Sequence, residues 1–420
     1  RFIADAEISL FSPHDVPGLY DAFGTDRFDD LYVDFERDES IPRKTIGAQK
    51  LILDLLKERA ETGRVYIMNI DHCNSHSSFK DKVNMSNLCQ EITLPTDPIK
   101  HIDDDGGEIA LCILSAINVG KIKNLDEMEE LCDLSVRGLE ELIDYQGYPV
   151  AAAERATRAR RSLGVGFIGL AHYLAKLGHK YDDPAALYAV HELTEAFQFY
   201  LLKSSNDLAK EKGQCEAFYR TKYADGTLPI DTYKADVDEL VAPKYNYDWD
   251  SLRDDIIRYG LRHSTLSAQM PSESSSVVSN ATNGIEPPRA YLSIKKSKKG
   301  PLKQIVPQYN SLKNNYTLLW DMPDNSGYIN VVAVIQKFFD QAISGNWSYN
   351  PENYPDNEVP MKVIAQDLLT TYKYGWKTSY YQNTYDQKGD DLLDEKKEAL
   401  ENMLASLENT EEDDCESCKI

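Results

Sequence analysis

The alternation of helical and strand-like patterns is the feature that most constrains the fold of this chain. Residues 45–62 carry apolar side chains at helical spacing, and Gly63 then indicates the end of the helix. Residues 64–70 have a strand-like pattern. Residues 108–115 form a nearly continuous apolar run, as expected for a strand buried in a parallel sheet. This alternation predicts an α/β fold with parallel strands, and it leaves open whether the sheet closes on itself.

Three more elements follow from local signals. Residues 125–145 repeat apolar side chains at helical spacing. Asp183 followed by Pro184 is a helix cap with proline at the first helical position, and the helix should run towards Gly213. A strand is expected at residues 263–270.

Composition excludes several classes of protein. The chain has 46 basic and 69 acidic residues and a net charge of −23, which argues against binding to nucleic acids and anionic membranes. No run approaches about 18 consecutive apolar residues, and the start has no signal-peptide pattern. Seven scattered cysteines do not form a secreted disulfide framework, so we expect a reducing, cytoplasmic compartment. Because the chain begins at Arg1, we expect a fragment, a processed product or part of a split protein.

A thiol, a carboxylate and a carboxamide alternate within residues 86–91. In an extended segment, Asn87, Cys89 and Glu91 would share one face and bring a thiol, a general base and a hydrogen-bonding amide together. The alternative is an ordinary loop with a half-buried cysteine.

Several motifs in one order resemble the large (alpha) subunit of class I ribonucleotide reductases of bacterial or phage type. The resemblance begins with LFSPHDVPGLYDAF near the start and covers essentially the whole chain. It implies part of a ten-stranded α/β barrel with a central finger loop, where residues 1–386 are the C-terminal portion of the barrel domain and residues 387–420 are a flexible acidic tail. The motifs are SNLCQEI at 86–92, GEIALCILSAINVG at 107–120, PSESSSVVSNATNGIEPPR at 271–289, KTSYYQNT at 377–384 and the terminal CESCKI.

The resemblance implies reduction of ribonucleoside diphosphates to 2′-deoxyribonucleoside diphosphates, the precursors of DNA, by thiyl-radical chemistry. Cys89 would form the thiyl radical that removes the 3′ hydrogen of the ribose. Glu91 would take the proton of the 3′ hydroxyl, and Asn87 would hydrogen-bond the sugar hydroxyls. Leu88 and Gln90 would complete the loop that contacts the substrate.

Cys112 lies inside an apolar run, where a cysteine is ordinarily a small core residue. The resemblance implies instead that Cys112 is one half of a redox dithiol that reduces the substrate. Its partner would belong to an N-terminal portion that is absent from this chain.

The serine-rich segment before Ser276 is expected to follow a strand and to begin a helix. Free backbone N–H groups at a helix N-terminus can bind phosphate, and the alternative is a helix cap that serves the fold alone. The resemblance implies binding of the substrate diphosphate by five consecutive residues. They are Pro271, Ser272, Glu273, Ser274 and Ser275.

Tyr380 and Tyr381 form an adjacent pair, which composition alone explains in a chain with 26 tyrosines. The resemblance implies that both belong to a chain of redox-active side chains that carries the radical to Cys89.

Cys415 and Cys418 form a CxxC pair in an acidic tail. Half a zinc site is one interpretation, but no second ligand pair completes it. Thiol-disulfide exchange suits the pair better, and the acidic neighbours should raise the thiol pKa, which is typical of a shuttle. The resemblance implies that this dithiol re-reduces the active-site disulfide and is itself reduced by thioredoxin or glutaredoxin.

Two local patterns point to other functions. Residues 164–169 fit GxGxxG, the fingerprint of an NAD-linked oxidoreductase, but the preceding segment is too polar for the buried strand that such a motif requires. Asp71, His72, Cys73 and His76 are metal-ligand types that we expect to form hydrogen bonds in a loop. We expect no metal and no cofactor bound by this chain.

The implied partners lie on other polypeptides. A small (beta) subunit with a metal centre and a tyrosyl radical would supply the radical. The N-terminal portion of the alpha subunit would hold most of the sites for ATP and dNTP effectors, and the complete alpha subunit would form a homodimer. An alternative is that the chain is an assembly piece of a split reductase, inactive without the N-terminal chain.

Overall fold

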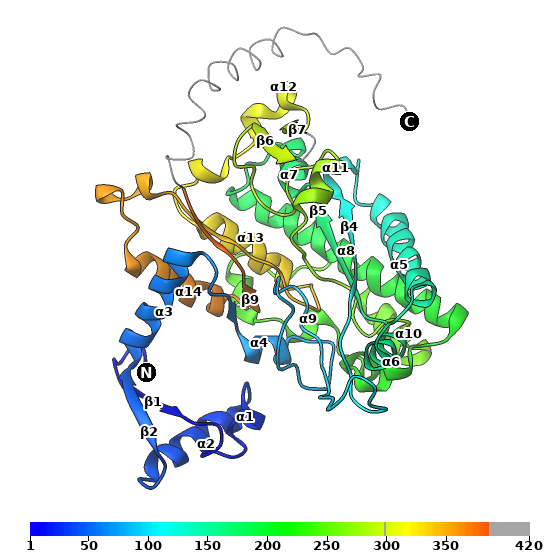
Figure 1. Ribbon diagram of the computed structural model, residues 1–420. Helices are drawn as coiled ribbons and strands as arrows, with labels where there is room; N and C mark the ends of the chain where they lie inside the picture. The colour runs from blue at the N-terminus through cyan, green and yellow to red at the C-terminus, as the bar shows by residue number, and fades with distance from the viewer. Residues whose placement is uncertain (298–299, 386–420) are drawn as a thin grey trace.

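The computed structural model describes residues 1–297 and 300–385, which Figure 1 traces from blue to red. The first part of the chain is a two-stranded antiparallel sheet with short helices beside it, followed by a longer helix that leads to the body of the protein. Its elements are β1 (Glu7–Phe11), α1 (Leu19–Ala22), α2 (Asp26–Arg37), β2 (Arg43–Gly47) and α3 (Ala48–Thr62).

Helix α3 ends where the sequence predicts. Gly63 adopts a left-handed φ of 70°, and its N–H donates to the carbonyl oxygen of Arg59 at 2.8 Å. The predicted start at residue 45 is wrong, because residues 45–47 pair with β1 as part of β2.

The strand predicted at residues 64–70 is much shorter in the structure. Only β3 (Ile67–Met68) is a strand, because its antiparallel partner β9 (Thr378–Ser379) is two residues long. Ile70 already begins the next helix, α4 (Ile70–Ser75).

Parallel strands form the centre of the molecule, as predicted. β4 (Ile113–Asn118) pairs in parallel with β5 (Leu163–Ile168). The strand expected at 108–115 therefore lies later in the chain, at 113–118, because pairing starts only where Ile113 meets Leu163, the first residue of β5. Parallel bridges continue from β5 to Ser267 and then from Gln269 to Ile343, so residues 263–270 are extended but form isolated bridges rather than a full strand.

Two glycines of the GxGxxG pattern lie inside β5. A Cβ atom on Gly164 would lie 2.5 Å from Leu114 Cδ2, and one on Gly166 would lie 2.6 Å from the carbonyl oxygen of Ala268. These glycines allow neighbouring segments to approach closely. A dinucleotide-binding loop instead places its glycines after the strand.

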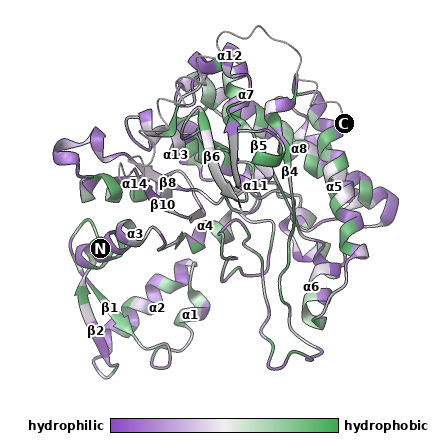
Figure 2. Cartoon of the chain, turned by 45° about the horizontal axis from the view of Figure 1, so that its top comes forward, coloured by the Kyte–Doolittle hydropathy of each residue, from purple (hydrophilic) through white to green (hydrophobic). Residues whose placement is uncertain are grey.

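Long helices cover the parallel strands. Helix α8 (Pro184–Lys212) begins with Pro184 and ends before Gly213, as predicted. The helix predicted at 125–145 is also confirmed, although α5 (Glu127–Tyr145) begins two residues later than expected. Helix α5 packs against α8 and β4, and Figure 2 shows apolar and polar residues alternating along it, as expected for a helix with one buried face. The other helices of this region are α6 (Ala151–Arg160), α7 (Leu170–Lys176), α9 (Pro229–Thr232), α10 (Trp249–Tyr259) and α11 (Glu273–Val278).

The last part of the described chain returns to the body of the protein. A hairpin of two antiparallel strands lies at the top of Figure 1, and β8 pairs in parallel with β10. The elements are β6 (Leu292–Ser297), β7 (Gly300–Ile305), α12 (Tyr309–Leu312), α13 (Ser326–Gln336), β8 (Trp347–Tyr349), α14 (Met361–Lys373) and β10 (Gln382–Thr384).

The structure supports an α/β fold with parallel strands. Across residues 1–297 and 300–385 the strands do not close into a barrel, so the ten-stranded arrangement is not confirmed. Within the same ranges no helix is long and apolar enough to cross a membrane. The tail predicted at 387–420 lies outside the described residues.

Candidate active site

Residues 86–92 form a tight loop, which we call the finger loop, that Asn87 closes. The N–H of Asn87 donates to the carbonyl oxygen of Ile92 at 3.1 Å, and the N–H of Ile92 donates to Asn87 Oδ1 at 3.1 Å. Gln90 has a left-handed φ of 72° and donates its N–H to the carbonyl oxygen of Asn87. The prediction of an extended segment is therefore wrong, because the asparagine side chain satisfies the backbone locally and stabilises a turn.

Ser344 nevertheless holds Cys89 and Glu91 together. Its hydroxyl hydrogen-bonds the carbonyl oxygen of Cys89 and lies 3.2 Å from Glu91 Oε2. The N–H of Ala342 donates to the carbonyl oxygen of Glu91 at 3.0 Å. Glu91 is buried, whereas the neighbouring Leu88 is 78% exposed. The thiol and the carboxylate therefore stay adjacent in the loop, held there by Ser344, which lies 253 positions after Glu91.

A pair of tyrosines leads to the Cys89 thiol. The hydroxyl of Tyr380 donates to Cys89 Sγ at 3.4 Å, and the rings of Tyr380 and Tyr381 have centroids 4.1 Å apart. Burial and the hydrogen bond to Cys89 hold the pKa of Tyr380 well above its usual range. The hydrogen bonds with Tyr380 and Tyr66 lower the pKa of Tyr381. Tyr66, whose ring lies 4.7 Å from that of Tyr380, is a member of the cluster that sequence reasoning missed.

A buried arginine anchors the backbone of this pair. Arg59 of α3 donates to the carbonyl oxygen of Tyr380 at 2.7 Å and to that of Tyr381 at 3.4 Å. Its guanidinium lies 4.7 Å from the ring centroid of Trp347. Burial lowers the pKa of Arg59 to about 10, so the group remains charged at neutral pH.

Cys112 is partly buried and directly precedes β4. Gln341 Nε2 donates to Cys112 Sγ at 3.6 Å. Burial raises the pKa of the Cys112 thiol, and the carboxylates of Asp340 and Glu91 act in the same direction. Cys112 is thus within electrostatic range of the carboxylate that lies beside Cys89.

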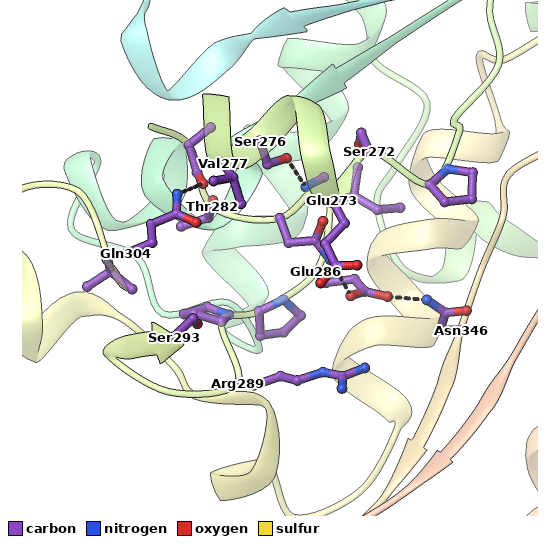
Figure 3. A pocket seen from close by; sticks show the side chains of 18 of the residues that line it. Ser272, Glu273, Ser276, Val277, Thr282, Glu286, Arg289, Ser293, Gln304 and Asn346 are labelled. Atoms are coloured by element: carbon purple, nitrogen blue, oxygen red, sulfur yellow. Dashed lines mark hydrogen bonds between the residues drawn. The ribbon is translucent and has the colours of Figure 1, made fainter. Parts of the chain in front are cut away.

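A cavity of about 490 Å³ lies beside Tyr380 and Tyr381 and is shown in Figure 3. Ser344 and both tyrosines of the pair line it. Of the five residues predicted to bind a diphosphate, the structure places three in the lining, while the side chains of Ser274 and Ser275 are exposed and belong to no part of it. The three in the lining are Pro271, Ser272 and Glu273.

Charged groups of both signs face the cavity. Glu286 accepts hydrogen bonds from Asn346 Nδ2 and, at 3.0 Å, from Asn283 Nδ2, and burial raises its pKa. Arg289 points into the same space and Glu273 lines it too (Figure 3). An anionic group in this cavity would be attracted by Arg289 and repelled by the carboxylates of Glu273 and Glu286. The backbone N–H groups at the start of α11 would offset this repulsion for an anion that lies close to them.

The metal-ligand types at residues 71–76 form hydrogen bonds, as predicted. His72 Nδ1 lies 2.9 Å from the carbonyl oxygen of Trp376, His76 lies 2.8 Å from that of Gln336, and Asp71 accepts from Tyr372. They lie on α4 and after it, however, rather than in a loop. Among the described residues no group of three or more His, Cys, Asp or Glu could hold a metal ion. Cys415 and Cys418 lie outside the described residues.

Comparison with known proteins identifies the family. The model of the ribonucleotide reductase barrel domain matches residues 1–382. The chain is 58% identical to the ribonucleoside-diphosphate reductase subunit alpha of Haemophilus influenzae, over 92% of this chain and 52% of that protein. It is 52% identical to the ribonucleoside-diphosphate reductase 1 subunit alpha of Escherichia coli and 41% identical to the ribonucleoside-diphosphate reductase subunit alpha of Enterobacteria phage T4, in both cases over 100% of this chain and 55% of the relative.

The chain therefore belongs to the ribonucleotide reductase family. It spans about half the length of the curated relatives that it matches.

Proposed function

We propose that this chain is the C-terminal, thiyl-bearing portion of a class I ribonucleoside-diphosphate reductase alpha subunit. The observation that carries the proposal is the contact between the Tyr380 hydroxyl and Cys89 Sγ, at 3.4 Å. A hydrogen atom can pass over such a distance between a thiol and a phenoxyl radical. Tyr381, 37% exposed, connects this contact to the surface, where a radical from a separate subunit would arrive.

The proposed chemistry begins when the Tyr380 radical takes the hydrogen atom of the Cys89 thiol. The resulting thiyl radical removes the 3′ hydrogen of the ribose, while Glu91 accepts the proton of the 3′ hydroxyl. The 2′ hydroxyl leaves as water. Cys112 and a second thiol on the N-terminal portion supply two electrons and become a disulfide, and the 3′ hydrogen returns from Cys89. The balance is one ribonucleotide and two thiols converted into one deoxyribonucleotide, one water and one disulfide.

Substrate binding is assigned to the finger loop and the cavity beside it. Asn87, Leu88 and Gln90 would face the sugar together with Cys89 and Glu91. The diphosphate would lie at the start of α11, at residues 271–275, and Arg289 in the cavity supports an anionic ligand there. Ser274 and Ser275 would contribute through their backbone, since their side chains do not line the cavity.

The proposed partners complete the enzyme. Leu111 and Leu114, about 40% exposed on or just before β4, support an N-terminal portion that adds the remaining strands of a ten-stranded barrel. That portion would also hold most of the effector sites for ATP and dNTP. The other partners are a small beta subunit that contains the radical-generating metal centre, thioredoxin or glutaredoxin acting on Cys415 and Cys418, and a second alpha subunit in a homodimer. We place the enzyme in the cytoplasm, in keeping with five free cysteines among the described residues.

A reconstitution tests the proposal. The 420-residue chain with small subunit and reductant should be inactive, because it holds one thiol of the redox pair. Adding the N-terminal portion of the family in trans should restore turnover, and a Cys→Ser change at that portion's redox position should remove it again. Robust activity from residues 1–420 alone would contradict the mechanism. Failure of every combination would favour an assembly piece without catalysis.

A further inference from the structure

The carboxamide of Gln341 is fully used and has one allowed orientation. Its two N–H groups donate to the carbonyl oxygen of Leu163 at 3.0 Å and to Cys112 Sγ at 3.6 Å. Its oxygen accepts the backbone N–H of Thr93 at 3.3 Å. A flipped amide would set its oxygen against the Leu163 carbonyl and its NH2 against the Thr93 N–H, so the hydrogen-bond partners fix which end faces the sulfur.

The backbone of Gln341 is held just as firmly. Its N–H donates to the carbonyl oxygen of Ser267 at 3.1 Å. Its carbonyl oxygen accepts from Lys377 Nζ and from Gln336 Nε2, both at 2.8 Å. The residue is fully buried. Because the fold already fixes the conformation of the Gln341 side chain, little further conformational entropy is lost when its N–H orients the Cys112 thiol.

We propose that Gln341 is a positioning residue for the Cys112 thiol, whose sulfur it holds with an N–H while its oxygen holds the backbone just after the finger loop at Thr93. This inference rests on the redox role proposed for Cys112. It explains how the finger loop and a thiol on a different segment keep one relative position.

The groups around Cys112 define what Gln341 does to it. Burial disfavours the thiolate, and so do the carboxylates of Asp340 and Glu91. Two uncharged residues, Gly164 of β5 and Ala268 of the extended segment 263–270, lie on this side of Cys112. The Gln341 N–H is the contact that favours the thiolate, because a donor to sulfur stabilises the negative charge. Gln341 therefore offsets part of the rise in the pKa of the Cys112 thiol that burial and the two carboxylates cause.

The test measures alkylation of Cys112 by iodoacetamide in the full 420-residue chain, read as a pH profile by peptide mass spectrometry. Gln341→Met should shift the profile to higher pH and slow alkylation at a fixed pH by about tenfold, the value of one hydrogen bond to a charged group. Gln198→Met is the matched control. Gln198 is also fully buried, but its carboxamide forms no hydrogen bond within the described structure. Its variant should keep the Cys112 profile.

A second variant separates the N–H donor from packing. Gln341→Glu preserves size and the acceptor for Thr93 but replaces the donor by an oxygen, so the shift to higher pH should be larger still. If Gln341→Met unfolds the chain, iodoacetamide will also alkylate the buried Cys132, and Gln341→Glu then becomes the deciding variant. An unchanged Cys112 profile in Gln341→Glu would overturn the inference. Alkylation needs no turnover, so this experiment is independent of the redox role proposed for Cys112. An unchanged alkylation profile would overturn the positioning role of Gln341 even if Cys112→Ser abolishes activity of the completed enzyme. Normal activity of Cys112→Ser would overturn the redox role even if the alkylation profile shifts.

Discussion

The hydroxyl of Tyr380 lies 3.4 Å from the sulfur of Cys89, although 291 positions separate the two residues. The ring of Tyr381 lies tilted against that of Tyr380, and the buried Arg59 holds the backbone carbonyls of both residues. The atoms proposed to carry the radical, the Cys89 sulfur and the two tyrosine hydroxyls, are therefore the terminal atoms of their side chains, and the rest of each side chain packs against its neighbours. Removing such an atom should separate loss of chemistry from loss of fold.

Cys89→Ser should abolish nucleotide reduction in the completed enzyme, because a hydroxyl is not oxidised as readily as a thiol. The change is nearly isosteric in a partly exposed loop, so the free energy of unfolding should change by less than about 1 kcal/mol. Turnover and urea unfolding measure the two effects. Cys215→Ala, at a buried cysteine remote from the loop, should keep activity. Normal turnover of Cys89→Ser would end the assignment of the thiyl radical.

Tyr380→Phe and Tyr381→Phe should each stop radical delivery while substrate binding and fold remain. One hydroxyl is lost and the ring volume stays. Activity assays, together with binding of a nucleoside diphosphate, measure the separation. Tyr372→Phe removes a hydroxyl that donates to Asp71 instead, and it should leave turnover intact. If either variant of the pair kept full activity, the radical would have to travel by another path.

The double change of Cys415 and Cys418 to Ser should distinguish two reductants. Turnover driven by thioredoxin should collapse, since the proposed carrier of electrons is gone. A small dithiol that diffuses into the site should still support slow turnover. An equal loss with both reductants would mean that the tail acts in folding or subunit contact.

The buried Glu140 should make the fold sensitive to acid. Burial acts against its ionised form, but hydrogen bonds from His263, Arg161 and Arg262 outweigh it and lower the pKa of Glu140 below its ordinary 4.5. A lowered folded-state pKa gives stability that is fully present above the unfolded value. That stability is lost as the pH falls through the folded value.

Urea unfolding at a series of pH values tests this. Glu140→Gln should lose about 3 to 5 kcal/mol at neutral pH, because it breaks a buried charge network, and its stability should fall less steeply in acid. Glu141→Gln, at the exposed neighbour on α5, should change little. Parallel curves for Glu140→Gln and the unsubstituted chain would show that other groups control the acid response.

Local signals predicted the parts of the fold that local chemistry decides. The proline after Asp183 and the glycine at 213 mark the ends of α8 because capping depends on neighbouring residues. Strand limits were predicted less well. β4 begins at Ile113 because its partner β5 begins at Leu163, and no pattern near residue 113 contains that information.

In the candidate site, too, local features could be predicted from the sequence and long-range contacts could not. Cys89 and Glu91 belong to one recognisable motif, but the turn that Asn87 closes replaced the expected extended segment. Ser344 and Gln341 are separated by 253 and 229 positions from the side chains that they hold. A serine or glutamine at such a position has no local signature, so only the folded chain reveals them.

The separations within the site also bear on when it forms. Arg59 reaches the carbonyl oxygen of Tyr380 across 321 positions, and the Cys89 contact spans almost as many. Long loops cost entropy before their closing contacts return any energy, so contacts of this kind form late in folding. A partly folded chain in which residues 89 and 380 have not yet come together thus presents Cys89 without its tyrosine, and it lacks the connection through which a radical would reach the thiol.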